Sequence, residues 1–184
     1  MADLRRNAVR ALTPALAVAA LAAVASCSGA PDEDIPRRIC ETNISPEITR
    51  PLIGRAGAFD EYSRLDNKGA HTAPCVLLLD EKAVMRFRFA WSSDRVDPMK
   101  YAESTLSVSN LTEPRRTEGR YRSVVGNEGA MSTVACKKAG ESYFTLTMKL
   151  PEAPTSDSQL RGDIEEFMTA YMNATVKKLG CRGK

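Results

Sequence analysis

Four cysteines are the side chains of this 184-residue chain best able to do chemistry together. Cys40, Cys75, Cys136 and Cys181 lie more than 30 residues apart and form no C-x-x-C pair, the spacing that redox and zinc sites use. An even number of separated cysteines in an exported domain indicates two disulfides. Three pairings are possible, and we favour Cys40–Cys75 and Cys136–Cys181, because each would fasten a terminal segment to a predicted strand. We predict no metal site and no cofactor.

A fifth cysteine, Cys27, closes the sequence Val24-Ala25-Ser26-Cys27, which has the form of a bacterial lipobox. Three arginines lie in the first ten residues, and an uncharged, alanine-rich run follows over residues 11–25, as in an export signal. In such signals a diacylglycerol is attached to the cysteine thiol and the chain is cut just before it. We therefore expect lipidation at Cys27 and a location on the extracytoplasmic face of the cell membrane.

This N-terminal pattern divides the chain into three parts. We expect residues 1–26 to be a lipoprotein signal peptide that is removed, residues 27–37 to be the lipidated cysteine with a flexible tether, and residues 38–184 to form a single extracytoplasmic domain. A transmembrane helix is disfavoured, because the apolar run is shorter than the about 20 residues that cross a bilayer. An ordinary secretory signal, which would leave Cys27 as a free thiol, and twin-arginine export both stay open.

The only histidine, His71, is the candidate for general-base chemistry, and it lies in a loop-like Gly-Ala-His-Thr-Ala-Pro segment. The chain has no Gly-x-Ser-x-Gly, Ser-x-x-Lys or His-Glu-x-x-His pattern, so the common arrangements for an activated serine or a catalytic zinc are missing. We assign no catalytic residue. A hydrolase that uses His71 or carboxylates is the alternative.

The charge of the chain gives no sign of a nucleic-acid partner. Its formal net charge is +3, and residues 1–26 contribute +2 of this, so the remainder carries +1. Four arginines fall between residues 115 and 122, but Glu113 and Glu118 lie beside and among them. A solvated, mixed-charge loop or strand face is favoured there over a site for phosphate or an anionic polymer.

Alternating side chains predict several antiparallel strands. The clearest case runs from Val84 to Trp91, where apolar residues alternate with Arg86 and Arg88. We interpret residues 57–72 as a loop and residues 106–111 as a weaker strand. Short polar turns between the later candidates indicate an antiparallel meander. The main strand candidates cover residues 75–79, 84–91, 121–125, 131–137 and 143–150.

The longest predicted helix closes the domain. It begins after Ser156 or Asp157 and ends at Gly180, with an apolar stripe at spacings of three to five residues. Shorter helices are expected after Ser45 and after Asp97. We therefore predict an α+β fold: an antiparallel sheet of about four to six strands, with the long C-terminal helix packed on one face, and two disulfides.

The chain resembles small membrane-anchored lipoproteins of actinobacteria. These share an alanine-rich signal, a lipobox such as Val24-Ala25-Ser26-Cys27, a short acidic tether and an α+β domain with paired cysteines. Only the lipobox is specific, so Cys27 is the one residue whose role the resemblance carries over. Most members of this group have no assigned function, and the resemblance implies a lipid-anchored protein of the cell envelope.

The anchor, the paired cysteines and the lack of a catalytic pattern together favour a non-enzymatic binding module. Its expected partners are the membrane, through diacylglycerol on Cys27, and an envelope protein, lipid or cell-wall ligand. Such a module should carry a surface groove or an exposed apolar patch without converging ionisable groups. A hydrolase should instead place a polar cleft with perturbed titrating groups around His71.

Overall fold

The computed structural model describes residues 35–55, 57–65, 71–105, 107, 109–138, 140–153 and 157–181. These residues belong to one compact unit of the chain. The predicted signal peptide, the predicted lipobox with Cys27 and most of the predicted tether lie outside the described residues. Ile35, which the sequence places in the tether, is buried, so packing begins slightly before residue 38.

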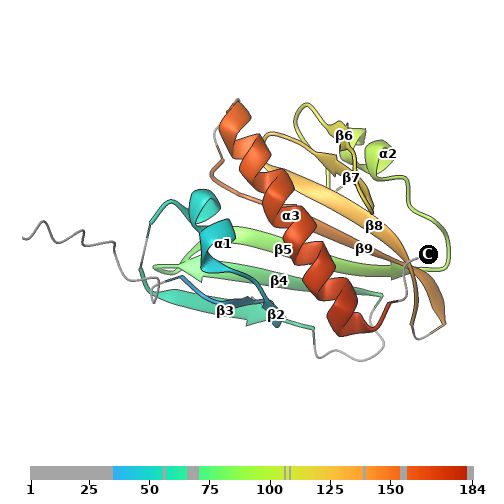
Figure 1. Ribbon diagram of the computed structural model, residues 1–184, viewed down its shortest axis with the longest axis horizontal. Helices are drawn as coiled ribbons and strands as arrows, with labels where there is room; N and C mark the ends of the chain where they lie inside the picture. The colour runs from blue at the N-terminus through green and yellow to red at the C-terminus, as the bar shows by residue number, and fades with distance from the viewer. Residues whose placement is uncertain are drawn as a thin grey trace, which may run out of the picture. The chain divides into compact units, whose positions relative to one another are not determined.

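Seven antiparallel strands form the main sheet, in the order β3-β4-β5-β9-β8-β7-β6 (Figure 1). The predicted α+β class is confirmed, and the sheet has one strand more than the upper limit expected. A separate hairpin of two short strands precedes it. The strands are β1 (Arg38–Ile39), β2 (Thr42–Asn43), β3 (Phe59–Ser63), β4 (Thr72–Leu79), β5 (Lys82–Ser92), β6 (Arg115–Thr117), β7 (Arg122–Val125), β8 (Gly129–Lys138) and β9 (Glu141–Lys149).

Two long hairpins form the middle of the sheet. Asp80 and Glu81 join β4 to β5 with positive φ angles of 49° and 65°, the backbone of a two-residue type I′ turn. β8 and β9 form the second hairpin, and the two hairpins meet where β5 pairs with β9. Phe87 lies opposite Met148 in that pairing, so alternate side chains of both strands reach the same face.

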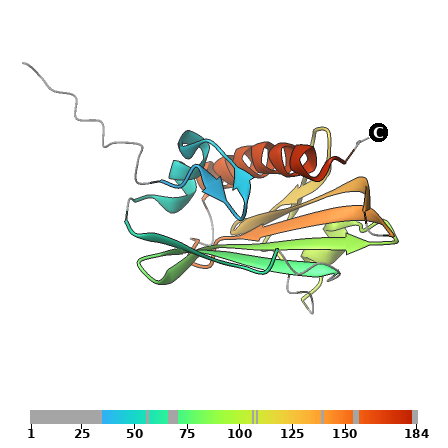
Figure 2. The same cartoon turned by 90° about the horizontal axis from the view of Figure 1, so that it is seen from below.

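Figure 2 shows α1 (Pro46–Ile53), α3 (Ser158–Leu179) and the β1–β2 hairpin on one face of the sheet, here called the inner face. Apolar side chains of β5 and β9 meet the apolar side of α3 there, as their spacing predicts. The Phe87 ring stacks on Tyr171, with 4.9 Å between the ring centroids. Other fully buried side chains of this core are Leu77, Met85, Phe144, Leu146, Met148, Ile164, Phe167 and Met172.

Local signals set the ends of α3. Of the two expected caps, Asp157 takes the role, and its side chain accepts hydrogen bonds from the backbone N–H groups of Gln159 and Leu160. Gly180 ends the helix with a φ of 70°, which glycine adopts without steric cost. No helix in the described part of the chain is long and apolar enough to cross a membrane.

The opposite face, here called the outer face, is covered only in part. α2 (Pro98–Glu103) packs on β7 and β8. Ala102 of α2 forms a second, small core there with Leu111, Val124 and Met131. Along β4 and β5, the side chains that alternate with the inner core are exposed or half-buried. The outer face therefore has a covered half and an open half.

Two sequence-based expectations are wrong. Residues 57–72 contain β3, an edge strand whose polar and charged side chains hide the strand pattern. In the predicted strand over 106–111, the described residues are not in a strand. Leu111 instead packs with Ala102 in the small outer core.

Candidate functional site

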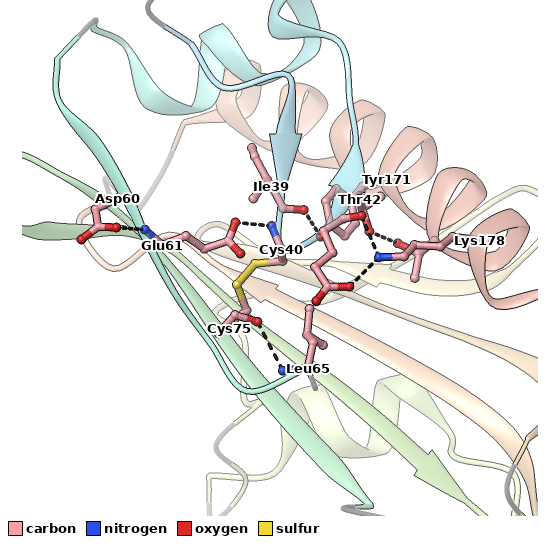
Figure 3. The surroundings of a disulfide bond; sticks show 12 residues. Ile39, Cys40, Thr42, Asp60, Glu61, Leu65, Cys75, Tyr171 and Lys178 are labelled. Atoms are coloured by element: carbon pink, nitrogen blue, oxygen red, sulfur yellow. Dashed lines mark hydrogen bonds and ion pairs between the residues drawn. A yellow bond between two sulfur atoms is a disulfide. The ribbon is translucent and has the colours of Figure 1, made fainter. Parts of the chain in front are cut away.

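Two disulfides fasten both ends of the domain to the sheet. Cys40, in the turn between β1 and β2, is bonded to Cys75 of β4 (Figure 3). Cys136 of β8 is bonded to Cys181, which follows α3. These are the two pairings that the sequence favours, and each joins a terminal segment to a strand.

Polar groups also hold the turn of the β1–β2 hairpin. Glu61 accepts a hydrogen bond from the Cys40 backbone N–H at 2.6 Å (Figure 3), and Lys178 donates to the Glu41 carboxylate at 2.7 Å. The Tyr171 hydroxyl donates to a carbonyl of β1 at 2.9 Å. The hydrogen bond from Lys178 holds the pKa of Glu41 below its ordinary value, and burial raises the pKa of Tyr171. All these hydrogen bonds hold the β1–β2 hairpin in its position on the inner face.

The disulfide of the hairpin also gathers three side chains of metal-ligating type. The sulfur atoms of Cys40 and Cys75 and a carboxylate oxygen of Glu61 lie within 4.8 Å of one another. Cysteine binds metals as a thiolate, and these two sulfurs are bonded to each other. The Glu61 carboxylate already accepts the Cys40 backbone hydrogen bond. In the disulfide form this cluster is therefore a structural clamp.

His71 lies at the surface beside a carboxylate. Its side chain is 76% exposed, and Nδ1 lies 2.9 Å from Oε1 of Glu141, the first residue of β9. The other carboxylate oxygen of Glu141 is buried without a hydrogen-bond partner among the described residues. A carboxylate on Nδ1 orients a histidine as in a general base. However, neither His71 nor Glu141 lines the two clefts described next.

One cleft opens between the end of α1, the β4–β5 turn and the start of α3. It has a volume of about 390 Å³, and apolar side chains such as Leu52 and Leu160 contribute to its lining. Several polar groups at this cleft already serve the fold. Asp157 caps α3, and Arg55 pairs with Asp80 at 2.5 Å. The charges that remain around it are of both signs, so they select no particular ligand.

A second cleft, here called the outer cleft, lies on the outer face between β5, β9 and the α2 region. Its volume is about 360 Å³. Among the described residues Arg88 is its only charged lining residue, and six of the ten described lining residues carry hydroxyl groups. The hydroxyl-bearing residues are Ser92, Tyr101, Ser107, Ser109, Thr145 and Thr147.

Buried hydroxyl groups form part of the outer cleft. Thr145 and Thr147 alternate along β9 with inner-core residues, so they face outward, and each is only 6% exposed. Oγ1 of Thr147 lies 3.4 Å from Oγ of Ser109, and Thr145 donates to Oγ1 of Thr133 at 3.1 Å. A hydroxyl has one donor and two acceptor sites, so these oxygens retain capacity for a ligand.

Arg88 brings positive charge to the outer cleft. It lies directly opposite Thr147 in the β5–β9 pairing and is exposed. Within the described residues it forms no ion pair with a carboxylate. A single guanidinium among hydroxyls can bind an anionic group, but it does not form the acid–base pair that hydrolysis uses.

The arginine-rich stretch is split between the last two strands of the sheet. Arg115 and Arg116 belong to β6, and Arg122 belongs to β7. Arg116 lies 3.4 Å from the Asp97 carboxylate. Because Arg115 and Arg116 are consecutive strand residues, they point to opposite sides of the sheet, so these arginines do not form one cluster.

Comparisons of the chain with protein-family models, with curated proteins and with solved structures find no match. A surface groove is expected of a binding module, but the sequence did not indicate which residues form the outer cleft. The sequence pattern that could have indicated this cleft is the Thr-Leu-Thr run of β9. In this run Thr145 and Thr147 flank a leucine of the inner core.

Proposed function

We propose that this protein is a cell-envelope lipoprotein, held on the extracytoplasmic face of the cell membrane by diacylglycerol on Cys27. Its domain is a non-enzymatic binding module, and the outer cleft is the ligand site. The partner is an envelope protein, lipid or cell-wall component.

Two features support the anchored location. The sequence Val24-Ala25-Ser26-Cys27 follows a segment with the composition of an export signal. Two disulfides are typical of proteins in an oxidising compartment outside the cytoplasm. Each buried methylene of an acyl chain contributes about 0.8 kcal/mol to membrane binding, so two chains on one thiol hold a protein durably.

The outer cleft is the single observation that supports the binding role. Its hydroxyl groups and Arg88 can hydrogen-bond a polar ligand. Proton transfer between two titrating side chains would need a second ionisable group close to the first, and Arg88 is the only charged residue that the structure describes in this lining. Binding of a ligand without catalysis is the function that this lining supports best.

A hydrolase is the second candidate, and one observation favours it. The contact of 2.9 Å between His71 Nδ1 and Glu141 Oε1 orients the imidazole and leaves Nε2 for proton transfer. A nucleophile or an activated water would still be required beside it. Turnover of an envelope substrate that is lost in His71→Asn would favour this candidate over the binding module.

Retention of envelope material tests the binding role directly. The full-length protein, immobilised by a C-terminal tag, is expected to retain envelope fragments of its native host saturably. Thr147→Val keeps the side-chain size but removes one hydroxyl of the outer cleft, so it should weaken retention several-fold, at the roughly 1 kcal/mol of a hydrogen bond.

Thr169→Val is the matched control, because Thr169 is exposed on α3 and lies outside the outer cleft. Its retention of fragments should equal that of the wild type. Absence of saturable retention, or equal retention by Thr147→Val and the wild type, would contradict the proposed function.

A further inference from the structure

We propose that the outer cleft and the open sheet beside it bind an acidic, polyhydroxylated polymer of the cell envelope. This is a glycan or polyol chain that carries carboxylate or phosphate groups. The inference rests on the proposed binding function and names the ligand class of the same site.

The hydroxyl lining indicates a ligand rich in hydroxyl groups. Thr145, Thr147 and Ser109 present buried oxygens, while Tyr101 stands at the exposed edge. Serine and threonine hydroxyls rotate to donate or accept. They can therefore match the mixed donors and acceptors of a sugar or polyol, whereas an apolar ligand would leave their remaining donor and acceptor capacity unused.

Two unpaired cations beside the cleft indicate that the ligand is acidic. Arg86 and Arg88 alternate with inner-core residues along β5, so both face outward, and both are exposed. Neither forms an ion pair within the described part of the chain. Arg88 lies opposite Thr147 at the cleft, and Arg86 lies opposite Lys149 one step along the same face. A guanidinium binds carboxylate or phosphate oxygens through two parallel hydrogen bonds.

Exposed aromatic rings extend the site along the open sheet. Tyr62 and Tyr101 are the large apolar side chains most exposed among the described residues, at 49% and 48%. Tyr62 of β3 lies opposite Val76, which in turn lies opposite Arg86. Neighbouring strands are about 4.8 Å apart, so Tyr62 belongs to the same outward surface as Arg86. A tyrosine ring combines an apolar face with a polar tip, which suits an extended chain of sugar rings.

Other anionic partners fit this surface less well. A bilayer surface is recognised by clusters of about four to eight basic residues, whereas the described lining of the cleft contains one charged residue, Arg88. A flat lipid surface also cannot enter a cleft of about 360 Å³. An acidic peptide would satisfy the arginines but would make little use of six hydroxyl-bearing lining residues.

The test measures polymer binding to the full-length protein, immobilised by a C-terminal tag. The acidic hydroxylated probes are polygalacturonate, which carries carboxylates, and poly(glycerol phosphate). The comparison probes are dextran, polyglutamate, and vesicles of phosphatidylglycerol against phosphatidylcholine. We expect saturable binding of at least one acidic hydroxylated polymer, weakened by salt, with binding of dextran and polyglutamate at least about tenfold weaker.

Arg88→Gln should weaken this binding about tenfold, the effect of one charge-assisted hydrogen-bonding group. Arg37→Gln is the matched control, because Arg37 is an exposed arginine beside the hairpin on the inner face, and its binding should equal that of the wild type. Both positions are exposed, so the circular dichroism spectra should be unchanged.

Three results would overturn the inference: no binding of either acidic polymer, equal binding of dextran or polyglutamate, or wild-type affinity in Arg88→Gln. If the protein bound phosphatidylglycerol vesicles more tightly than the polymers, the ligand of this surface would be a lipid instead. Retention of native envelope fragments without binding of the polymers would leave the binding function standing and remove only the ligand class.

Discussion

Glu41 and Lys178 join the first hairpin to the last helix, 137 positions apart in sequence. Lys178 donates to the carboxylate of Glu41 at 2.7 Å and to its backbone carbonyl at 2.8 Å. Glu41 and Cys40 both have positive φ angles, 60° and 47°, which cost non-glycine residues about 1–2 kcal/mol each. The ion pair and the disulfide thus stabilise a turn that its own residues disfavour.

The substitution Glu41→Gln should change how stability depends on pH. Lys178 lowers the pKa of Glu41 in the folded state, so the ionised carboxylate stabilises the fold above about pH 4.5, and this contribution is lost as the pH falls through the lowered pKa. Both side chains are 47% exposed, so the effect is below about 1 kcal/mol. Urea unfolding at pH 7 and pH 3 should show a smaller difference for Glu41→Gln than for the wild type.

Glu152→Gln is the control for this experiment, because Glu152 is exposed and forms no ion pair with the described residues. It should keep the wild-type difference between the two pH values. If Glu41→Gln behaved in the same way, the coupling between the hairpin and α3 would not depend on this carboxylate.

Among the elements, sequence patterns predict those that bury one regular face. β5 and α3 were recognisable because their apolar residues repeat at the spacing of a strand and of a helix. β3 was not, because its Phe-Asp-Glu-Tyr-Ser sequence lies at the sheet edge and buries little. β1 and β2 have two residues each, too few to show a period, and their position depends on Cys40 and on contacts with α3.

Replacing both Cys136 and Cys181 by serine should destabilise the domain through α3. The disulfide closes a segment with a sequence separation of 45, and the loop-entropy relation gives about 3–4 kcal/mol before any strain is subtracted. The midpoint of urea unfolding should fall accordingly. Backbone hydrogen exchange should increase first in the last turns of α3, which the bond fastens to β8.

The double variant of Cys40 and Cys75 is the comparison for that measurement. Its sequence separation is 35, so its loss of stability should be similar. Exchange should then increase at the β1–β2 hairpin and not at the end of α3. Faster exchange in the same residues of both variants would show that the two disulfides do not hold separate segments.

At the scale of the whole molecule, the outer cleft arises from segments far apart in sequence. Thr147 comes from β9, Arg88 from β5 and Ser109 from the segment after α2. None of these three residues belongs to a sequence motif that would indicate a binding site. The segment that contains Ser109 was predicted in part to be a strand. The cleft forms because α2 packs on β7 and β8 and covers only that half of the outer face, so the cleft lies beside the open half. The sheet and its helix could thus be predicted, while the site depends on tertiary contacts.

The proposed lipid anchor at Cys27 would place this surface outside the cell membrane, where an envelope polymer can reach it. Both disulfides and the proposed ligand class suit that location. A cytoplasmic location would remove the oxidising conditions and the envelope partner together. The central claim, a location outside the cell membrane, therefore depends on the covalent state of Cys27.

Intact-mass measurement of the protein purified in detergent from its native host tests that claim most directly. We predict a chain that begins at Cys27 and carries the added mass of diacylglycerol on its thiol. A chain that still begins at Met1, or one that is cleaved but carries no acyl group, would contradict the account.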